Sequence, residues 1–190
     1  MTLAEPNFLL SLRRRTRQAH EDLERQLPLL SPDLTLEAYR DVLVRFARVQ
    51  PPLERAIEAV LVADRRRAVD ELDLPARRKE PALRRDLAQL ATTMPAQPPC
   101  GVAIDSVPAA VGALYVTEGA TLGGTVIATH LRGYLGADVP FFGFYGSDVA
   151  ARWATFRRAT RSLVHSDRDV AEGADAADAV FAWFGRTLIP

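Results

Sequence analysis

A histidine and two arginines lie on one side of a predicted helix near the start of the sequence. Arg13, Arg17 and His20 are spaced by four and three residues, which places them on successive turns of a helix. A neutral imidazole is a common metal ligand, and a guanidinium pairs well with carboxylates. Together these groups suit a planar ligand with a metal at its centre and carboxylates at its edge. The alternative is that His20 is a core residue and that the arginines form the exposed side of the helix.

A group of glycines lies in the longest nearly uncharged run of the chain, residues 108–131. Gly119, Gly123 and Gly124 follow one another closely, although each glycine inside a helix costs about 1 kcal/mol relative to alanine. We therefore expect a bend there, or a face from which the missing side chains let a flat ring approach the backbone. Haem fits both groups, because its iron takes an axial histidine and its propionates pair with arginine. Close packing between helices is the alternative explanation for the glycines.

The hydrophobic periodicity around these groups predicts helices along the whole chain. They are expected at residues 8–27, from 35 onward, at 83–90, from 108 to about 133 or 136, from 148 and from about 168 to 188. No alternating strand pattern and no Asn-Gly hairpin competes with them. The sequence therefore predicts an all-α fold of about six to eight helices, in one domain that spans residues 1–190.

Two stretches of these helices carry more specific expectations. Pro51 and Pro52 are expected to kink or break the second helix, because proline removes a backbone donor and its ring meets the preceding turn. Residues 64–80 are rich in charge, with a basic triplet at 65–67, and are expected to form an exposed helix end and loop.

Composition and charge narrow the class of protein. The 24 Lys and Arg residues balance 24 Asp and Glu residues, so net charge gives no reason to expect a nucleic-acid partner. The single Cys100 cannot form an internal disulfide and suits a reducing cytoplasm, and the N-terminal basic residues follow the apolar ones, the reverse of a secretory signal. The run 108–131 is long enough to span a membrane, but Glu118 and several threonines dilute its apolarity. We expect a cytoplasmic protein without a membrane span.

Other catalytic motifs do not occur in the sequence. It contains no Glu-x-x-His, which argues against a di-iron carboxylate bundle built from that repeat. It also contains no Walker loop, no Gly-x-Ser-x-Gly and no cysteine pair. The other two histidines, His130 and His165, are expected to be structural or exposed.

Three segments of the chain resemble a known family. The segments LRRRTRQAHEDLE, GALYVTEGATLGGTVIATHL and FFGFYGSDVAARWATF, in this order, are similar to bacterial haem oxygenases of the branch associated with bacterial phytochromes. The motifs Thr-x-x-x-His and Glu-Gly-x-x-Leu-Gly-Gly are specific together and weak apart. The resemblance covers the chain from about residue 10 to residue 183.

The resemblance implies that haem lies between a proximal helix and a kinked distal helix. It places around the haem His20 as axial iron ligand, the distal residues Gly119, Ala120, Gly123 and Gly124, and the propionate contacts Arg13 and Arg17, with Arg158 or Arg157 as a looser match. It implies oxidative cleavage of haem to biliverdin, carbon monoxide and ferrous iron with O2. Electrons would come from a ferredoxin or a flavin reductase, and the biliverdin would pass to a bacterial phytochrome.

One position departs from the pattern of the family. Ala120 stands where many members have an aspartate that holds an ordered water for proton supply. Because small residues occur there in the phytochrome-associated branch, we interpret this as a different water network. Two alternatives remain open: a haem- or bilin-binding protein without turnover, and a ligand-free helical interaction protein in which the glycines only permit close packing.

Overall fold

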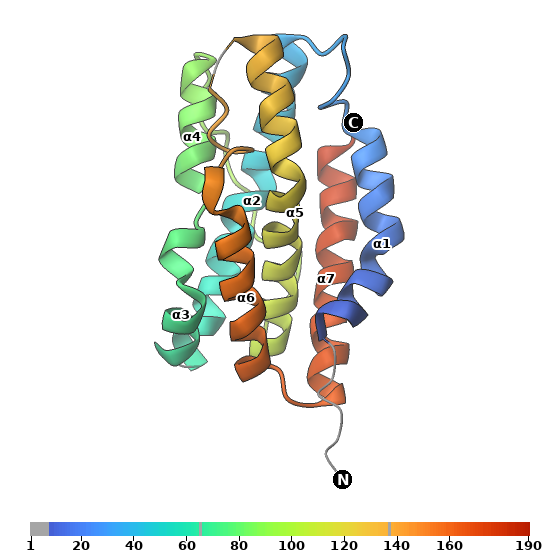
Figure 1. Ribbon diagram of the computed structural model, residues 1–190, viewed down its shortest axis with the longest axis vertical. Coiled ribbons are helices and arrows are strands. Elements are labelled where there is room, and N and C mark those ends of the chain that lie inside the picture. Colours follow the sequence, from blue (N-terminus) through green and yellow to red (C-terminus); the bar gives the residue numbers. More distant parts are fainter. Residues whose placement is uncertain (1–7, 65, 137) are drawn as a thin grey trace.

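The computed structural model describes residues 8–64, 66–136 and 138–190 (Figure 1). Throughout these ranges the regular structure is helical, so the predicted all-α class is confirmed. The elements are α1 Phe8–Gln26, α2 Leu36–Asp64, α3 Arg66–Leu72, η1 Leu74–Arg77, α4 Glu80–Gln89, α5 Val107–Leu135, η2 Gly146–Asp148, α6 Val149–Leu163 and α7 Asp167–Leu188. The η elements are short 3-10 turns.

Helix α5 is the central element of the fold. It packs against α2, α6 and α7, and α1 packs against α7. In Figure 1, α5 stands between α6 on one side and the α7–α1 pair on the other. The hydroxyl of Ser106 accepts a hydrogen bond from the backbone N–H of Ala109 at 3.2 Å, and Gly136 ends the helix with φ of 65°. The glycine-rich run is therefore one helix with the predicted bounds.

Two glycines allow α5 and α7 to approach closely. A Cβ on Gly112 would overlap the backbone carbonyl of Gly173. A Cβ on Gly173 would in turn collide with the ring of Phe8. Close helix packing, the alternative explanation for glycines in α5, therefore applies to Gly112, which lies outside the candidate site.

Helix α2 continues through its two prolines. Pro51 and Pro52 lie inside the helix and are buried beside the fully buried Leu53. The predicted break is therefore wrong, while the predicted kink stays a prediction. Each proline inside a helix costs about 3 kcal/mol, and burial of apolar surface on this turn offsets part of that cost.

Two hydrophobic clusters form the core. The first joins α1, α2, α5, α6 and α7 through residues such as Leu12, Leu53, Val111, Phe156 and Val180. The second joins α2, α4, the C-terminal half of α5 and the loop that follows it, through residues such as Leu43, Leu87, Leu131 and Phe141. Because α5 contributes to both clusters, its position depends on nearly every other helix.

One helix in the described part of the chain, at residues 107–133, is long and apolar enough to cross a membrane. Within it, 56% of the most apolar window is buried inside the protein. The apolar length of α5 therefore has a structural explanation, since the helix runs through the core.

Candidate functional site

His20 lies on α1, one turn after the buried Thr16, and its side chain is 45% exposed. The edge of its ring meets Phe181 of α7, with 5.9 Å between the ring centroids. Its Nδ1 atom lies 3.4 Å from Oε2 of Glu24, one turn further along α1. A carboxylate beside one ring nitrogen orients the imidazole and leaves Nε2 as the nitrogen available to a metal.

The face of α5 that carries Gly119 and Gly123 is open. A Cβ on Gly119 would have no neighbouring atom within 4 Å, and a Cβ on Gly123 would lie 3.8 Å from Oε1 of Glu24. The apolar side chains Leu122 and Val126, on the same side of the helix, are 44% and 61% exposed. The carboxylate of Glu24 therefore links the two predicted groups, because it lies beside His20 and beside the glycine face.

Helices α1 and α5 meet at Tyr115, one turn before Gly119. The side chain of Thr16 and the charge of Arg13, both on α1, act on the Tyr115 hydroxyl. Burial raises the pKa of Tyr115, while Thr16 and Arg13 act in the opposite direction. Side chains therefore bridge the two helices at Tyr115, whereas one turn later the absent side chain of Gly119 leaves space. Tyr115 was not among the predicted site residues, although its spacing of four residues from Gly119 places it on the same face of α5.

Three arginines of α1 differ in their surroundings. Arg15 forms ion pairs with Asp175 and Asp178 of α7, the first at 2.6 Å, and so ties α1 to α7. Arg13 and Arg17 are exposed, and Arg17 lies one turn before His20. These two are the residues that the sequence analysis selected as carboxylate contacts, and their exposed side chains leave them available for that role.

Three other predicted site residues occupy different surroundings. Gly124 is buried, and a Cβ there would lie 2.7 Å from the backbone oxygen of Phe142, so this glycine permits packing of the 139–145 loop on α5. Ala120 is exposed. Arg158 is exposed on α6 and donates to Thr155 at 3.2 Å. Because α5 stands between α6 and α1 (Figure 1), the structure does not bring Arg158 next to His20.

The described part of the charged segment, residues 66–80, differs from the predicted exposed helix end and loop, because it forms α3 and η1. The side chains of the basic triplet at 65–67 lie outside the described residues. Although the segment carries much charge, Arg77 and Lys79 are buried, with side chains 1% and 5% exposed. Both form ion pairs with Glu118, whose side chain is 1% exposed. The prediction is wrong for these two residues, because a buried carboxylate on the central helix supplies them with a partner.

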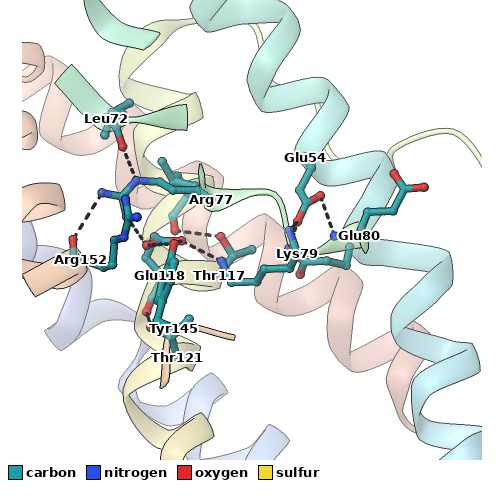
Figure 2. A network of polar contacts seen from close by, with 12 residues as sticks. Glu54, Leu72, Arg77, Lys79, Glu80, Thr117, Glu118, Thr121, Tyr145 and Arg152 are labelled. Atoms are coloured by element: carbon teal, nitrogen blue, oxygen red, sulfur yellow. Dashed lines mark hydrogen bonds and ion pairs between the residues drawn. The ribbon is translucent and has the colours of Figure 1, made fainter. Parts of the chain in front are cut away.

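Glu118 is the centre of this buried network (Figure 2). One carboxylate oxygen accepts from Nζ of Lys79 at 2.7 Å and the other from Nη1 of Arg77. The hydroxyl of Tyr145 lies 3.0 Å from both oxygens. The signal in the sequence was the presence of one formal charge, Glu118, inside an apolar helix, because a charge there needs a buried partner.

The fold and the site together define an all-helical protein in which a half-exposed histidine and a glycine face flank one carboxylate. The sequence model described as "Heme oxygenase" matches residues 6–189. The chain therefore belongs to the haem oxygenase family. The family expected from the sequence is confirmed, while the phytochrome-associated branch stays a prediction.

The comparison with solved structures supports the same fold. The chain is similar to the haem oxygenase of Neisseria meningitidis, whose crystal structures are reported in NO- and CO-bound form. The TM-score is 0.78 at 18% sequence identity, and the alignment covers 95% of this chain and 89% of that chain. At this identity the similarity establishes the fold alone. A search of curated proteins found no match.

Proposed function

We propose that the protein is a haem oxygenase that binds haem between α1 and α5 and cleaves it to biliverdin, carbon monoxide and ferrous iron. The observation that carries the proposal is the position of Glu24, which lies beside both the half-exposed imidazole of His20 and the open glycine face of α5. Because the chain belongs to the haem oxygenase family, we infer that the ligand bound at this place is haem. In this proposal, residues 1–190 form one domain that carries the whole site.

The residues at this place fit a haem. His20 would hold the haem iron through Nε2, because Nδ1 lies beside Glu24. The space in front of Gly119 would be filled by any side chain there, so the glycine admits a flat ring near the backbone. The exposed Leu122 and Val126 offer apolar contact. When bound, haem supplies the iron at which O2 is activated and is itself the substrate.

The remaining residues orient and enclose the ring. Arg13 and Arg17 would hold the propionates, since both are exposed on the His20 helix and guanidinium groups pair strongly with carboxylates. Tyr115 would close one end of the site, where it interacts with Thr16 of α1. Glu24 would hold the proton position on His20, favouring hydrogen on Nδ1 and a free lone pair on Nε2.

Proton supply is the step for which this chain differs from many family members. The methyl group of Ala120 cannot hold a water through a hydrogen bond. Backbone carbonyls of α5 near Gly119, together with solvent that reaches the exposed Ala120, would then support the water network. Electrons would come from a ferredoxin or a flavin reductase in the cytoplasm, and the biliverdin would serve a bacterial phytochrome.

The proposal is tested by adding haemin to the purified protein and then supplying ascorbate with O2. We expect a Soret band that decays into a bilin spectrum with release of carbon monoxide. The His20→Ala variant should lose the axial-ligand spectrum, and added imidazole should restore it. The matched control is His165→Ala, because His165 is exposed beyond the end of α6. A haem spectrum in His20→Ala identical to the parent would refute the axial assignment.

The same assay separates the alternatives. Haem that binds to the parent protein but stays intact would identify a carrier, a function that Ala120 favours because it removes a group used for proton supply. A protein that ignores haemin would be a ligand-free interaction protein. The empty surroundings of Gly119 argue against that function, since a glycine used for close packing would have a neighbour, as Gly112 does.

A further inference from the structure

A buried ionic network lies on the same turn of α5 as the open glycine face. Glu118 immediately precedes Gly119, and its side chain leaves α5 about 100° around the helix axis from it. The partners of Glu118 come from two parts of the chain. Arg77 ends η1 and Lys79 follows it in the link to α4, whereas Tyr145 lies in the loop before η2 (Figure 2). One carboxylate thus joins two segments, residues 77–79 and the loop at Tyr145, to the same turn of α5.

The partners of Glu118 are themselves held in place. Arg77 also donates from Nε to the carbonyl of Leu72 and from Nη2 to the carbonyl of Arg152 at 3.3 Å. The backbone N–H of Lys79 donates to Glu54 at 2.7 Å, and the charges of Glu54 and Lys79 attract each other. Two carboxylates therefore face two cations, which makes the network close to neutral.

Stability alone is a weak reason for such a network. Removing charged groups from water is costly, and a buried ion pair often stabilises a protein no more than well-packed apolar side chains would. What the network adds is a defined position, because every donor around Glu118 has a fixed direction. The adjacent part of α5 has few packing contacts that could define its position on the open side. Gly119 has no neighbour within 4 Å, and Ala120, Leu122 and Gly123 are exposed.

Interactions within α5 itself also stabilise residues 117–125 poorly. Thr117, Thr121 and Thr125 each donate to a carbonyl three residues earlier in α5. Bonds of this kind slightly destabilise helices and often bend them. Glycines in the same stretch lower helix propensity further. The position of this stretch relative to His20 must therefore be set by contacts on its buried side.

We propose that Glu118 is a positioning residue that, through Arg77, Lys79 and Tyr145, fixes the distance and angle of the Gly119–Gly123 stretch over the substrate site. This rests on the proposed function for its chemical consequence. The orientation of haem under α5, and with it the ratio of biliverdin isomers, then depends on a carboxylate that does not touch the substrate.

The test compares the parent protein with Glu118→Gln and Tyr145→Phe. The first keeps the shape of the side chain and removes its charge, and the second removes only one hydrogen bond donor, so it remains informative if the first does not fold. The control is Arg168→Gln, which breaks an exposed ion pair with Glu172 on α7. Amide hydrogen exchange of residues 119–124 is measured without haem. The ferric haem spectrum and the isomer ratio are measured with haem.

We expect exchange in residues 119–124 to rise at least about fivefold in Glu118→Gln, with a smaller rise in Tyr145→Phe. The isomer ratio should change by a similar factor and the ferric spectrum should shift, while the control matches the parent. Unchanged exchange would overturn the proposal. A lower melting temperature with the parent's isomer ratio and spectrum would overturn it too, because the network would then be merely structural. If the parent does not cleave haem, the proposed function fails along with the catalytic consequence, and exchange still decides whether Glu118 holds α5.

Discussion

Oε2 of Glu24 lies 3.4 Å from Nδ1 of His20, on the side of the imidazole away from the nitrogen that a metal would use. The same carboxylate points its other oxygen toward Gly123 of α5. Glu24 therefore acts on both walls of the candidate site. It orients the axial residue, and it marks how closely α1 and α5 approach.

Glu24→Ala should lower haem affinity by about ten- to a hundredfold, because loss of the partner of a metal-bound histidine has effects of this size. Titration with haemin, followed at the Soret band, measures the change. Glu21→Ala, an exposed acidic neighbour on α1, is the control for loss of charge and should leave the affinity near the parent value. Equal losses in both variants would mean that general charge, and not orientation of His20, is responsible.

Alanine at the two glycine positions 119 and 124 should have opposite effects on the haem-free protein. Gly119→Ala meets no atom within 4 Å, so it should raise stability by up to about 1 kcal/mol through helix propensity. Gly124→Ala places a methyl group 2.7 Å from the oxygen of Phe142, which should cost about 1–3 kcal/mol. Urea unfolding measures both. Destabilisation of the two variants to the same extent would show that position 119 is packed.

Gly119→Leu should separate binding from folding. Its side chain would fill the space that the proposed haem occupies, so haem affinity should fall at least about tenfold, equivalent to roughly 1.4 kcal/mol. The unfolding midpoint without haem should stay at or above that of the parent, because no atom lies near the substituted position. Unaltered haem binding would remove the glycine face from the site.

Arg17→Ala and Arg158→Ala test which arginines reach the propionates. Arg17 shares α1 with His20, whereas Arg158 lies on α6, across α5. Loss of one exposed charge pair should weaken haem binding about two- to fivefold in Arg17→Ala, and the difference should shrink at high salt. Arg158→Ala should bind haem as the parent does. A larger loss in Arg158→Ala would support the propionate contact that the resemblance implies for Arg158.

Asp86 should make stability depend on pH. It is buried on α4 and accepts the backbone N–H of Phe141 at 2.7 Å. Burial, with help from the charge of Asp138, raises the pKa of Asp86 from 3.8 to about 7, against the opposing effects of Phe141 and Arg85. The native state therefore holds a proton that the unfolded chain has lost between these values, and this contribution to stability is full below about 4 and disappears as pH rises through about 7.

Asp86→Asn should abolish that dependence, because an amide oxygen can still accept from Phe141 and carries no charge. At pH 8 the variant should be more stable than the parent, by at most about 4 kcal/mol for this pKa difference. Below about pH 4 the two should converge. Melting temperatures measured across this range check the prediction, and parallel curves for the two proteins would contradict it.

The predictable part of the molecule is the part encoded by local periodicity. His20 and its arginines, and the run around Gly119, stand on strongly amphipathic or apolar helices, so their faces follow from spacing alone. The surroundings of Gly124 do not follow from spacing, because its neighbour is the backbone carbonyl of Phe142 in a loop. Spacing carries no information about which loop covers which turn of a helix. The same limit explains Pro51, whose tolerance depends on burial within the assembled core.

The partners in the buried network around Glu118 could not be predicted from the sequence for a different reason. Arg77 and Lys79 lie in a segment whose charge density is typical of exposed chain, and their partner Glu118 is about 40 residues away in the sequence. One formal charge in an apolar helix predicts that a buried partner exists, but it does not identify which residue that partner is. Only the tertiary fold, which lays η1 against α5, identifies it.

Lys79 is the only lysine in the chain, and its side chain is 5% exposed. Reagents that acylate primary amines therefore find one side-chain target, and that target is shielded by the carboxylate of Glu118 and the rings of Phe144 and Tyr145. Its labelling rate would report how often the interior behind the central helix opens to solvent. Because the chain uses arginine in place of lysine elsewhere, labelling of Lys79 would report local opening of the protein at this one site.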